Sequence, residues 1–274
     1  MRHTTMNVLL LVALALPAAA VGQEREAAQV MTEREAATVL LNDRDSPDVW
    51  HAIGLAVELG SRAGRELRTA VIEAGWAEVR READARAGVG PVGETDPDLL
   101  FMLFEAAEAL RDPRAIPLMI EALMYGMGAN ALADLGAAAL PAVLAAVNDP
   151  GGHPYRVSGG LTALRFMVED GSLNTRQLGQ VRGAAQGRLS GTQGYFFIDD
   201  AVRLALALGD PELHRTVERI AADRVYAERL VLDEFPSLAG SHAENTNYVQ
   251  ARARLFLAGG GADIEPTRRR TPPR

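Results

Sequence analysis

The chain of 274 residues has a formal net charge of −8 and no cysteine, which restricts both its partners and the means of stabilising its fold. Its 28 basic residues are all arginine, and an acidic, lysine-free protein is a poor candidate for binding nucleic acid, because that affinity comes from neutralising phosphates. Disulfide bonds are excluded, so burial of apolar surface must stabilise the fold. The arginine bias, with abundant alanine and glycine, indicates a bacterial protein from a GC-rich genome.

The amino terminus is typical of a secretory signal peptide. Arg2 begins a short basic region, residues 8–16 form an unbroken apolar run, and Ala18-Ala19-Ala20 has the small residues that a signal peptidase recognises. We expect cleavage after Ala20, or as a second choice after Gly22, and a mature protein that is periplasmic or secreted. An uncleaved membrane anchor is the less favoured alternative, because the apolar run is about half of the ~20 residues that span a bilayer. No other segment is apolar enough to span a membrane.

The rest of the chain has the sequence signals that begin and end helices. Apolar residues recur at i, i+3, i+4 and i+7, and Thr32 with Glu35 has the pattern of a capping box. Four further dipeptides place a good N-cap residue before a proline at the first helical position, where its missing N–H costs nothing. They are Ser46-Pro47, Asp96-Pro97, Asp112-Pro113 and Asp210-Pro211. These signals predict an all-α protein without a β-sheet.

The same signals, with the composition of the remaining stretches, divide the chain into five segments. We expect a signal peptide over 1–20, an amino-terminal helix and first hairpin over 21–83, a Gly/Pro linker over 84–95, a repeat array over 96–257 and a disordered tail over 258–274. The charged helix 24–41 and the segment 246–257 are expected to cap the array. Residues 223–245 fit either a degenerate hairpin or an irregular connector.

Two segments of the array are similar in register. Residues 115–123 (AIPLMIEAL) and 139–147 (ALPAVLAAV) both begin with alanine, a branched apolar residue and proline, and continue with apolar positions. A looser pair, 59–63 and 135–139, is separated by 76 residues, which is twice 38. The two best copies are only 24 residues apart. Either the helix around 129–135 is very short, or one hairpin has degenerated.

These features resemble short bacterial HEAT-repeat hairpins, including the type first described in phycobilisome lyases. The match is good for residues 97–148 and fair for 47–83 and 153–222. The resemblance implies an α-solenoid of roughly five to six hairpins that forms a right-handed superhelix, with the second helix of each hairpin lining a concave binding face. Because no single hairpin can bury its apolar side, each is expected to pack against the next.

The patterns that could indicate a nucleotide or metal site are weak. Residues 88–93 fit G-x-G-x-x-G, but they follow a charged helix rather than a strand, so they are better interpreted as a linker. His214 and Glu218 lie one helical turn apart, and two ligands do not make a metal site. Asp199 and Asp200 are consecutive and therefore point about 100° apart on a helix, so they are not expected to act as a catalytic pair.

Ser241, His242 and Glu244 are the residue types of a catalytic triad, but residues this close in sequence cannot hold both of its hydrogen bonds. The following residues 245–247 are better interpreted as the N-cap of the last helix. We therefore expect no catalytic, cofactor-binding or metal-binding residues. The aromatic residues of 195–198 are expected in the core.

Trp50 and Trp76 are expected on the two helices of the first hairpin, near each other.

The favoured hypothesis for function is an exported, non-catalytic scaffold that binds a protein or peptide along the concave face. The residues proposed to contact the partner are Arg65, Arg68, Glu121, Arg182 and Arg215. The alternative is a prosthetic-group lyase-like enzyme or an enzyme accessory built on the same repeats, although a shared fold is a weak argument for function. No nucleic-acid partner is expected, and the sequence leaves the oligomeric state open.

Overall fold

The computed structural model describes residues 31–89, 95–191, 193–232 and 241–260, and all structural statements refer to these ranges. For residues 193–196 and 232 only the backbone is described. The predicted signal peptide lies outside the described residues, as does the predicted tail from 261 onward.

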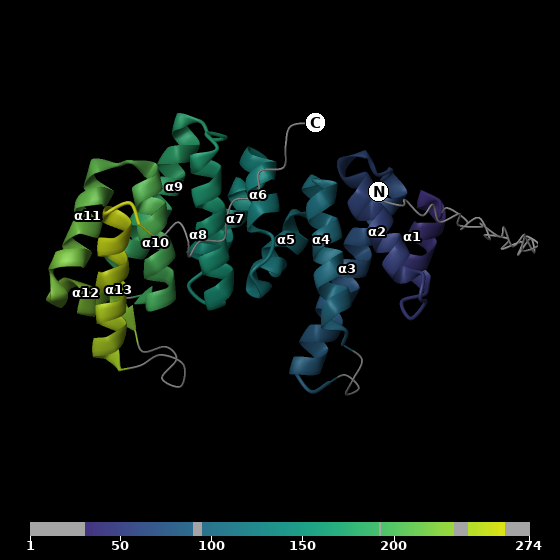
Figure 1. Cartoon of the computed structure of the whole chain (residues 1–274), viewed down its shortest axis with the longest axis horizontal. Helices are drawn as coiled ribbons and strands as arrows, with labels where there is room; N and C mark the ends of the chain where they lie inside the picture. Colours follow the sequence, from purple (N-terminus) through teal and green to yellow (C-terminus); the bar gives the residue numbers. More distant parts are fainter. Residues whose placement is uncertain (1–30, 90–94, 192, 233–240, 261–274) are drawn as a thin grey trace, which may run out of the picture. The chain divides into compact units, whose positions relative to one another are not determined.

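The described residues form thirteen α-helices, which confirms the predicted all-α class (Figure 1). The helices are α1 (Glu33–Asn42), α2 (Val49–Leu59), α3 (Arg65–Arg86), α4 (Pro97–Leu110), α5 (Ile116–Ala122), α6 (Ala129–Leu135), α7 (Leu140–Asn148), α8 (Pro154–Glu169), α9 (Thr175–Ser190), α10 (Tyr195–Leu208), α11 (Pro211–Ala222), α12 (Arg224–Leu230) and α13 (His242–Leu257). Four short 3₁₀ turns, η1 (Gly60–Arg62), η2 (Pro113–Ala115), η3 (Leu123–Tyr125) and η4 (Gly136–Ala138), lie between them.

A single pair of two-residue strands is the exception to the helical fold. Strand β1 (Gln193–Gly194) runs parallel to β2 (Val231–Leu232), with Gln193 opposite Val231. The prediction of no β-sheet holds for the other described residues. The pair forms where the chain enters α10 and where it leaves α12, in two extended stretches too short to give a strand pattern in the sequence.

Most of the predicted helix starts are confirmed. Thr32 and Glu35 form the capping box, and the carboxylates of Asp96 and Asp210 accept backbone N–H groups of the first helical turn. Asp112 caps the 3₁₀ turn η2, which leads directly into α5. The start predicted at Ser46-Pro47 is wrong, because these residues form a turn and α2 begins only at Val49.

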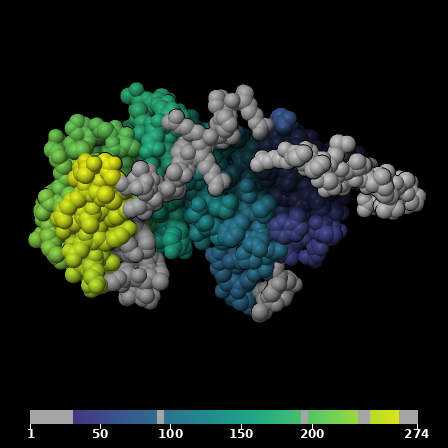
Figure 2. Space-filling model, viewed as in Figure 1, coloured from purple at the N-terminus to yellow at the C-terminus, as the bar shows by residue number. Residues whose placement is uncertain are grey.

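The helices pack in two alternating series. Among the described elements, α2, α4, α6, α8 and α10 each pack against the next member of that series, and α3, α5, α7, α9 and α11 do the same. The alternation ends with α13, which packs against α10, α11 and α12. Figure 2 shows α13 in yellow against the green helices that precede it. Consecutive hairpins therefore bury one another's apolar sides.

The bounds of three helices answer two open points of the sequence and correct one predicted boundary. Helix α6 has only seven residues, which explains the 24-residue spacing of the two best repeat copies. Helix α3 continues to Arg86, three residues into the segment predicted as a linker. Within 223–245, residues 224–230 form α12, which packs against α11 and α13, so these seven residues are not an irregular connector.

The core is a continuous layer of buried alanine and branched apolar side chains along the array. Its largest fully buried side chains include Phe104 and Phe166. Within the described ranges, no single helix is long and apolar enough to cross a membrane. One pair of segments, 129–138 and 140–148, meets the length and composition criteria together, but is bent by 120°.

Candidate functional site

A groove of about 630 Å³ lies on the face shared by α3, α5 and α7, the second helices of three successive hairpins. We call it the apolar groove. It is lined by Trp76, Pro117, Ile120, Glu121, Ala142, Ala145, Ala146, Asn148, Asp149 and Arg156. Its apolar wall comes from tryptophan, isoleucine and alanine side chains, and such a wall with a few polar groups at its edge is typical of ligand sites.

Small residues on these helices allow close helix packing and also leave space in the groove. A Cβ at Gly75 would lie 2.7 Å from Leu118 Cδ2, so this glycine permits close packing of α5 against α3. On α7, Ala142 and Ala145 present single methyl groups where larger side chains would fill the space. The alanine-rich sequence of α7 therefore has a structural consequence at the surface as well as in the core.

The polar edge of the groove is an ion pair between α5 and α8. Arg156 Nη2 lies 2.5 Å from Glu121 Oε2 and 3.1 Å from the sulfur of Met124. The Nε of Arg156 is buried and has no hydrogen-bond partner among the described residues. Because an unsatisfied buried donor is costly, a carbonyl or water in the groove would stabilise this side chain.

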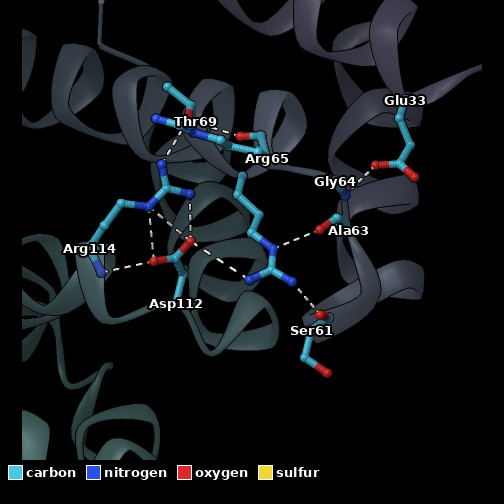
Figure 3. Close-up of polar contacts among 9 residues, drawn as sticks. Glu33, Ser61, Ala63, Gly64, Arg65, Thr69, Asp112 and Arg114 are labelled. Carbon is cyan, nitrogen blue, oxygen red and sulfur yellow. Dashed lines mark hydrogen bonds and ion pairs between the residues drawn. The ribbon is translucent and has the colours of Figure 1, made fainter.

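A second pocket, of about 490 Å³, lies near the start of α3 and is lined by Ala63, Arg65, Arg68 and Arg114. We call it the arginine pocket. The buried carboxylate of Asp112 lies beside it and accepts three hydrogen bonds from the Arg114 side chain (Figure 3). Nη2 donates to Oδ2 at 2.6 Å, and Nε donates to both oxygens at 3.1 Å. The hydrogen bonds from Arg114 lower the pKa of Asp112, which therefore remains ionised.

The guanidinium of Arg68 is fixed in place by the backbone. Its Nε donates to the carbonyl oxygen of Ala63 at 2.7 Å and its Nη2 donates to that of Ser61, while Nη1 lies 3.9 Å from Asp112. Arg114 also donates to the hydroxyl of Thr69 at 3.0 Å. Arg68 and Arg114 thus flank the carboxylate of Asp112, while Arg65 also lines the pocket and Glu33 accepts from the N–H of Gly64 beside it. The pocket has more arginines than acids, in an acidic protein.

A third pocket, of about 520 Å³, lies between the start of α6, α8 and α10. We call it the polar pocket. The hydroxyl of Ser158 donates to Asp200 Oδ2, and Arg203 Nη1 lies 3.9 Å from Asp200 Oδ1. Burial, against the hydrogen bond from Ser158, raises the pKa of Asp200 to about 6, and the neighbouring charge of Asp199 acts in the same direction.

The two consecutive acids of α10 interact with different helices, as their predicted divergence requires. Asp199 accepts two hydrogen bonds of 3.2 Å from Arg252 on α13, whereas Asp200 interacts with Ser158 on α8. Arg203 lies within ion-pair distance of both carboxylates. The pair therefore joins α10 to its neighbours on two sides.

The five residues predicted to contact a partner lie in different surroundings. Arg65 and Arg68 both line the arginine pocket, and Glu121 lines the apolar groove. Arg182 pairs with Asp210 at 2.7 Å and with Glu212 at 2.5 Å, so it links α9 to the start of α11. Arg215 is exposed on α11. The structure brings only the first two into one pocket.

The weak chemical motifs have ordinary structural roles. His214 and Glu218 are exposed and 3.6 Å apart on α11. No group of three or more His, Cys, Asp or Glu that could hold a metal ion occurs in the part of the chain that the structure describes. Gly88 follows helix α3, and the rest of the G-x-G-x-x-G pattern is described only as far as Val89.

The predicted N-cap of the last helix at 245–247 is wrong. Ser241 is the N-cap of α13 and forms a capping box with Glu244, so Asn245 and Thr246 lie inside the helix and are buried. In the aromatic cluster of α10, Phe197 and Ile198 are buried as expected. The side chains of residues 195 and 196 lie outside the described residues.

Several residues of the groove and the arginine pocket were missed by sequence reasoning. Trp76 was expected near Trp50, but no ring contact joins the two among the described residues, and Trp76 lines the groove instead. Arg114 was not singled out, although its spacing from the capping residue Asp112 is a usable signal. The alanines of α7 carry no such signal, because buried and exposed alanines look alike in sequence.

Comparison of the chain with protein-family models, with curated proteins and with solved structures finds no match.

Proposed function

We propose that this chain is an exported, non-catalytic scaffold of the HEAT-repeat kind that binds a protein or peptide partner in the apolar groove. The observation that carries the proposal is the position of the groove on α3, α5 and α7. These are the second helices of their hairpins, which the resemblance to HEAT repeats assigns to the binding face of an α-solenoid.

The packing of the helices supports the solenoid arrangement. First helices pack against first helices and second helices against second helices, from α2 to α11. A stack of this kind leaves one side of every second helix without a helical neighbour. An apolar groove along that side gives room for side chains of an extended or helical segment, as in other groove-binding modes.

The alternative function, a prosthetic-group lyase-like enzyme or its accessory, would use a different part of the molecule. A prosthetic group needs an enclosed site with directional polar contacts, and the polar pocket beside Ser158 and Asp200 offers such contacts. We favour the groove because its lining is mainly apolar and lies mainly on second helices, whereas the polar pocket lies mainly among the first helices α4, α6, α8 and α10.

A charge placed in the groove is expected to weaken partner binding without unfolding the protein. Ala145 is exposed on α7 and lines the groove, so Ala145→Glu should reduce the affinity for bound peptides by about tenfold or more, because the carboxylate would be desolvated against apolar side chains. Peptides selected on the wild-type protein from a random phage-displayed library, then synthesised and titrated by fluorescence anisotropy, provide the measurement.

Ala251→Glu is the matched control, because Ala251 is equally exposed in the interior of a helix, α13, that does not line the groove. Circular dichroism should show the wild-type helix content for both variants, since exposed substitutions usually change stability by no more than about 0.5 kcal/mol. Equal peptide affinity of the two variants would rule out the groove as the binding site. Failure to select any peptide would rule out peptide binding itself.

Export predicts a shortened mature protein. We expect the amino terminus of the protein recovered from a bacterial host to be Val21 or Gln23, because the cleavage pattern ends at Ala20 or Gly22. Cell fractionation followed by amino-terminal sequencing measures this. Full-length protein retained in the inner membrane would contradict the predicted cleavage.

A further inference from the structure

We propose that the arginine pocket binds a carboxylate group of the same peptide that occupies the apolar groove. This inference rests on the proposed function and names the chemistry that a partner must have. The peptide would carry an acidic side chain, or its own carboxyl terminus, at one end of an apolar segment.

The two sites lie along one face of α3. Arg65, Arg68, Ile72 and Trp76 are spaced by three or four residues, so their side chains share one side of the helix. The first two line the arginine pocket and the last lines the apolar groove. At 1.5 Å per residue, the distance along the helix axis from Arg65 to Trp76 is about 16 Å, which a peptide of about five extended residues covers.

The 3₁₀ turn η2 and the second helix α5 that follows it have the same order of residues. Arg114 lines the arginine pocket, while Pro117 and Ile120 follow at intervals of three residues and line the groove. Since α3 packs against α5, the two stripes lie side by side. The charged site and the apolar site thus follow each other in the same order along α3 and along the η2–α5 segment.

The arginine pocket has more positively charged side chains than negatively charged ones. Asp112 is the acid that pairs with Arg114 and, at 3.9 Å, with Arg68. The guanidinium of Arg65 is exposed and has no hydrogen-bond or ion-pair partner among the described residues. Beside the three arginines lie two carboxylates, that of Asp112 and that of Glu33, which accepts from the N–H of Gly64. The arginines still outnumber the acids, in a chain whose net charge is −8. A carboxylate placed between Arg65 and Arg114 would offset part of this excess.

The pocket is also held in shape before any ligand arrives. Arg68 is anchored to the carbonyl oxygens of Ser61 and Ala63, and Arg114 is anchored to Asp112 and Thr69. Their guanidinium groups therefore lose little conformational entropy on binding, which favours affinity. Arg65 is the exposed member without such an anchor, and it is the residue to change because its replacement breaks no hydrogen bond or ion pair of its side chain.

The test uses the full chain and peptides selected on it from the phage-displayed random library. We expect the selected peptides to share an acidic residue at a constant distance from apolar residues. Arg65→Glu should weaken their binding about tenfold, and replacing the acidic residue of the peptide by lysine should restore most of that loss, because the charges have been exchanged. Arg176→Glu, an exposed charge reversal on α9, should leave the affinity unchanged.

The outcomes separate this inference from the proposed function. Selected peptides with apolar residues but no shared acid, or with affinity unaffected by Arg65→Glu, would leave the groove standing and overturn the carboxylate site. The milder Arg65→Gln variant, expected to weaken binding about threefold, replaces Arg65→Glu if circular dichroism shows that the reversal unfolds the protein. Competition by inorganic phosphate but not by acetate would assign the pocket to phosphate and overturn the proposal.

Discussion

Replacing Gly128 with alanine is expected to lower the free energy of unfolding by about 3 kcal/mol, since the backbone there excludes a side chain. Gly128 has a φ of 87° at the N-cap of α6, and a Cβ would lie 2.5 Å from the carbonyl oxygen of Met119. Its N–H also donates to Glu108 Oε1 at 2.6 Å, a bond that the displaced backbone would lose. Urea denaturation followed by far-ultraviolet circular dichroism measures the change.

Gly126→Ala is the control for Gly128→Ala. Gly126 also has a positive φ, of 75°, but no atom lies within 4 Å of a Cβ built on it. Its replacement should therefore lower the free energy of unfolding by only about 1 kcal/mol, which is the cost of placing a residue with a Cβ at a positive φ. Equal losses for the two variants would mean that the contact with Met119 does not matter, and that the tight entry into α6 is not required for the short repeat.

The second large effect is a pH dependence of stability that originates at Asp200. Its pKa is raised from 3.8 to about 6 in the folded protein, so the folded state binds this proton more tightly than the unfolded state does. The associated stability is fully present below pH 3.8 and is lost as the pH rises to about 6. Between pH 4.5 and 7.5 we expect a loss of about 2 kcal/mol from this group.

Asp200→Asn removes the titrating proton and keeps an oxygen that can accept from Ser158. The difference in unfolding free energy between wild type and variant is measured by urea denaturation between pH 4.5 and 7.5. It should therefore change by about 2 kcal/mol over this range. The pKa values of Asp112 and Asp210 are lowered, so the titration of these two acids changes stability at a pH below this range. His153, whose pKa is lowered by burial, is present in both proteins and cancels. A pH-independent difference would contradict the assignment.

Local signals in the sequence were sufficient to predict the helical class and most helix starts. An N-cap such as Asp96 or Asp210 acts on its own first turn, so the stop and start of each helix are set within a few residues. Ser46 misled the prediction because its hydroxyl accepts from the N–H of Asp48, which makes a turn rather than a cap. Short polar side chains serve both purposes, and the sequence alone does not separate them.

The groove and the arginine pocket depend on contacts between repeats and were only partly predictable. Arg65 and Arg68 were singled out because they lie on a second helix, but their pocket also needs Arg114 from the next hairpin. Arg182, chosen on the same grounds, instead pairs with Asp210 of the following repeat. Whether an arginine is available to a partner depends on the acids that the neighbouring hairpin brings near, and periodicity does not report this.

The contacts of α13 with the preceding helices affect the mechanical unfolding of the protein. This helix packs against α10, α11 and α12, and the β1–β2 pair joins residues 38 positions apart, since 231 minus 193 is 38. Elsewhere, the main contacts of a hairpin are with its neighbours in the chain. Under a stretching force, the hairpins before α10 are therefore expected to detach one after another, whereas the α10–α13 block should rupture in a single, larger step.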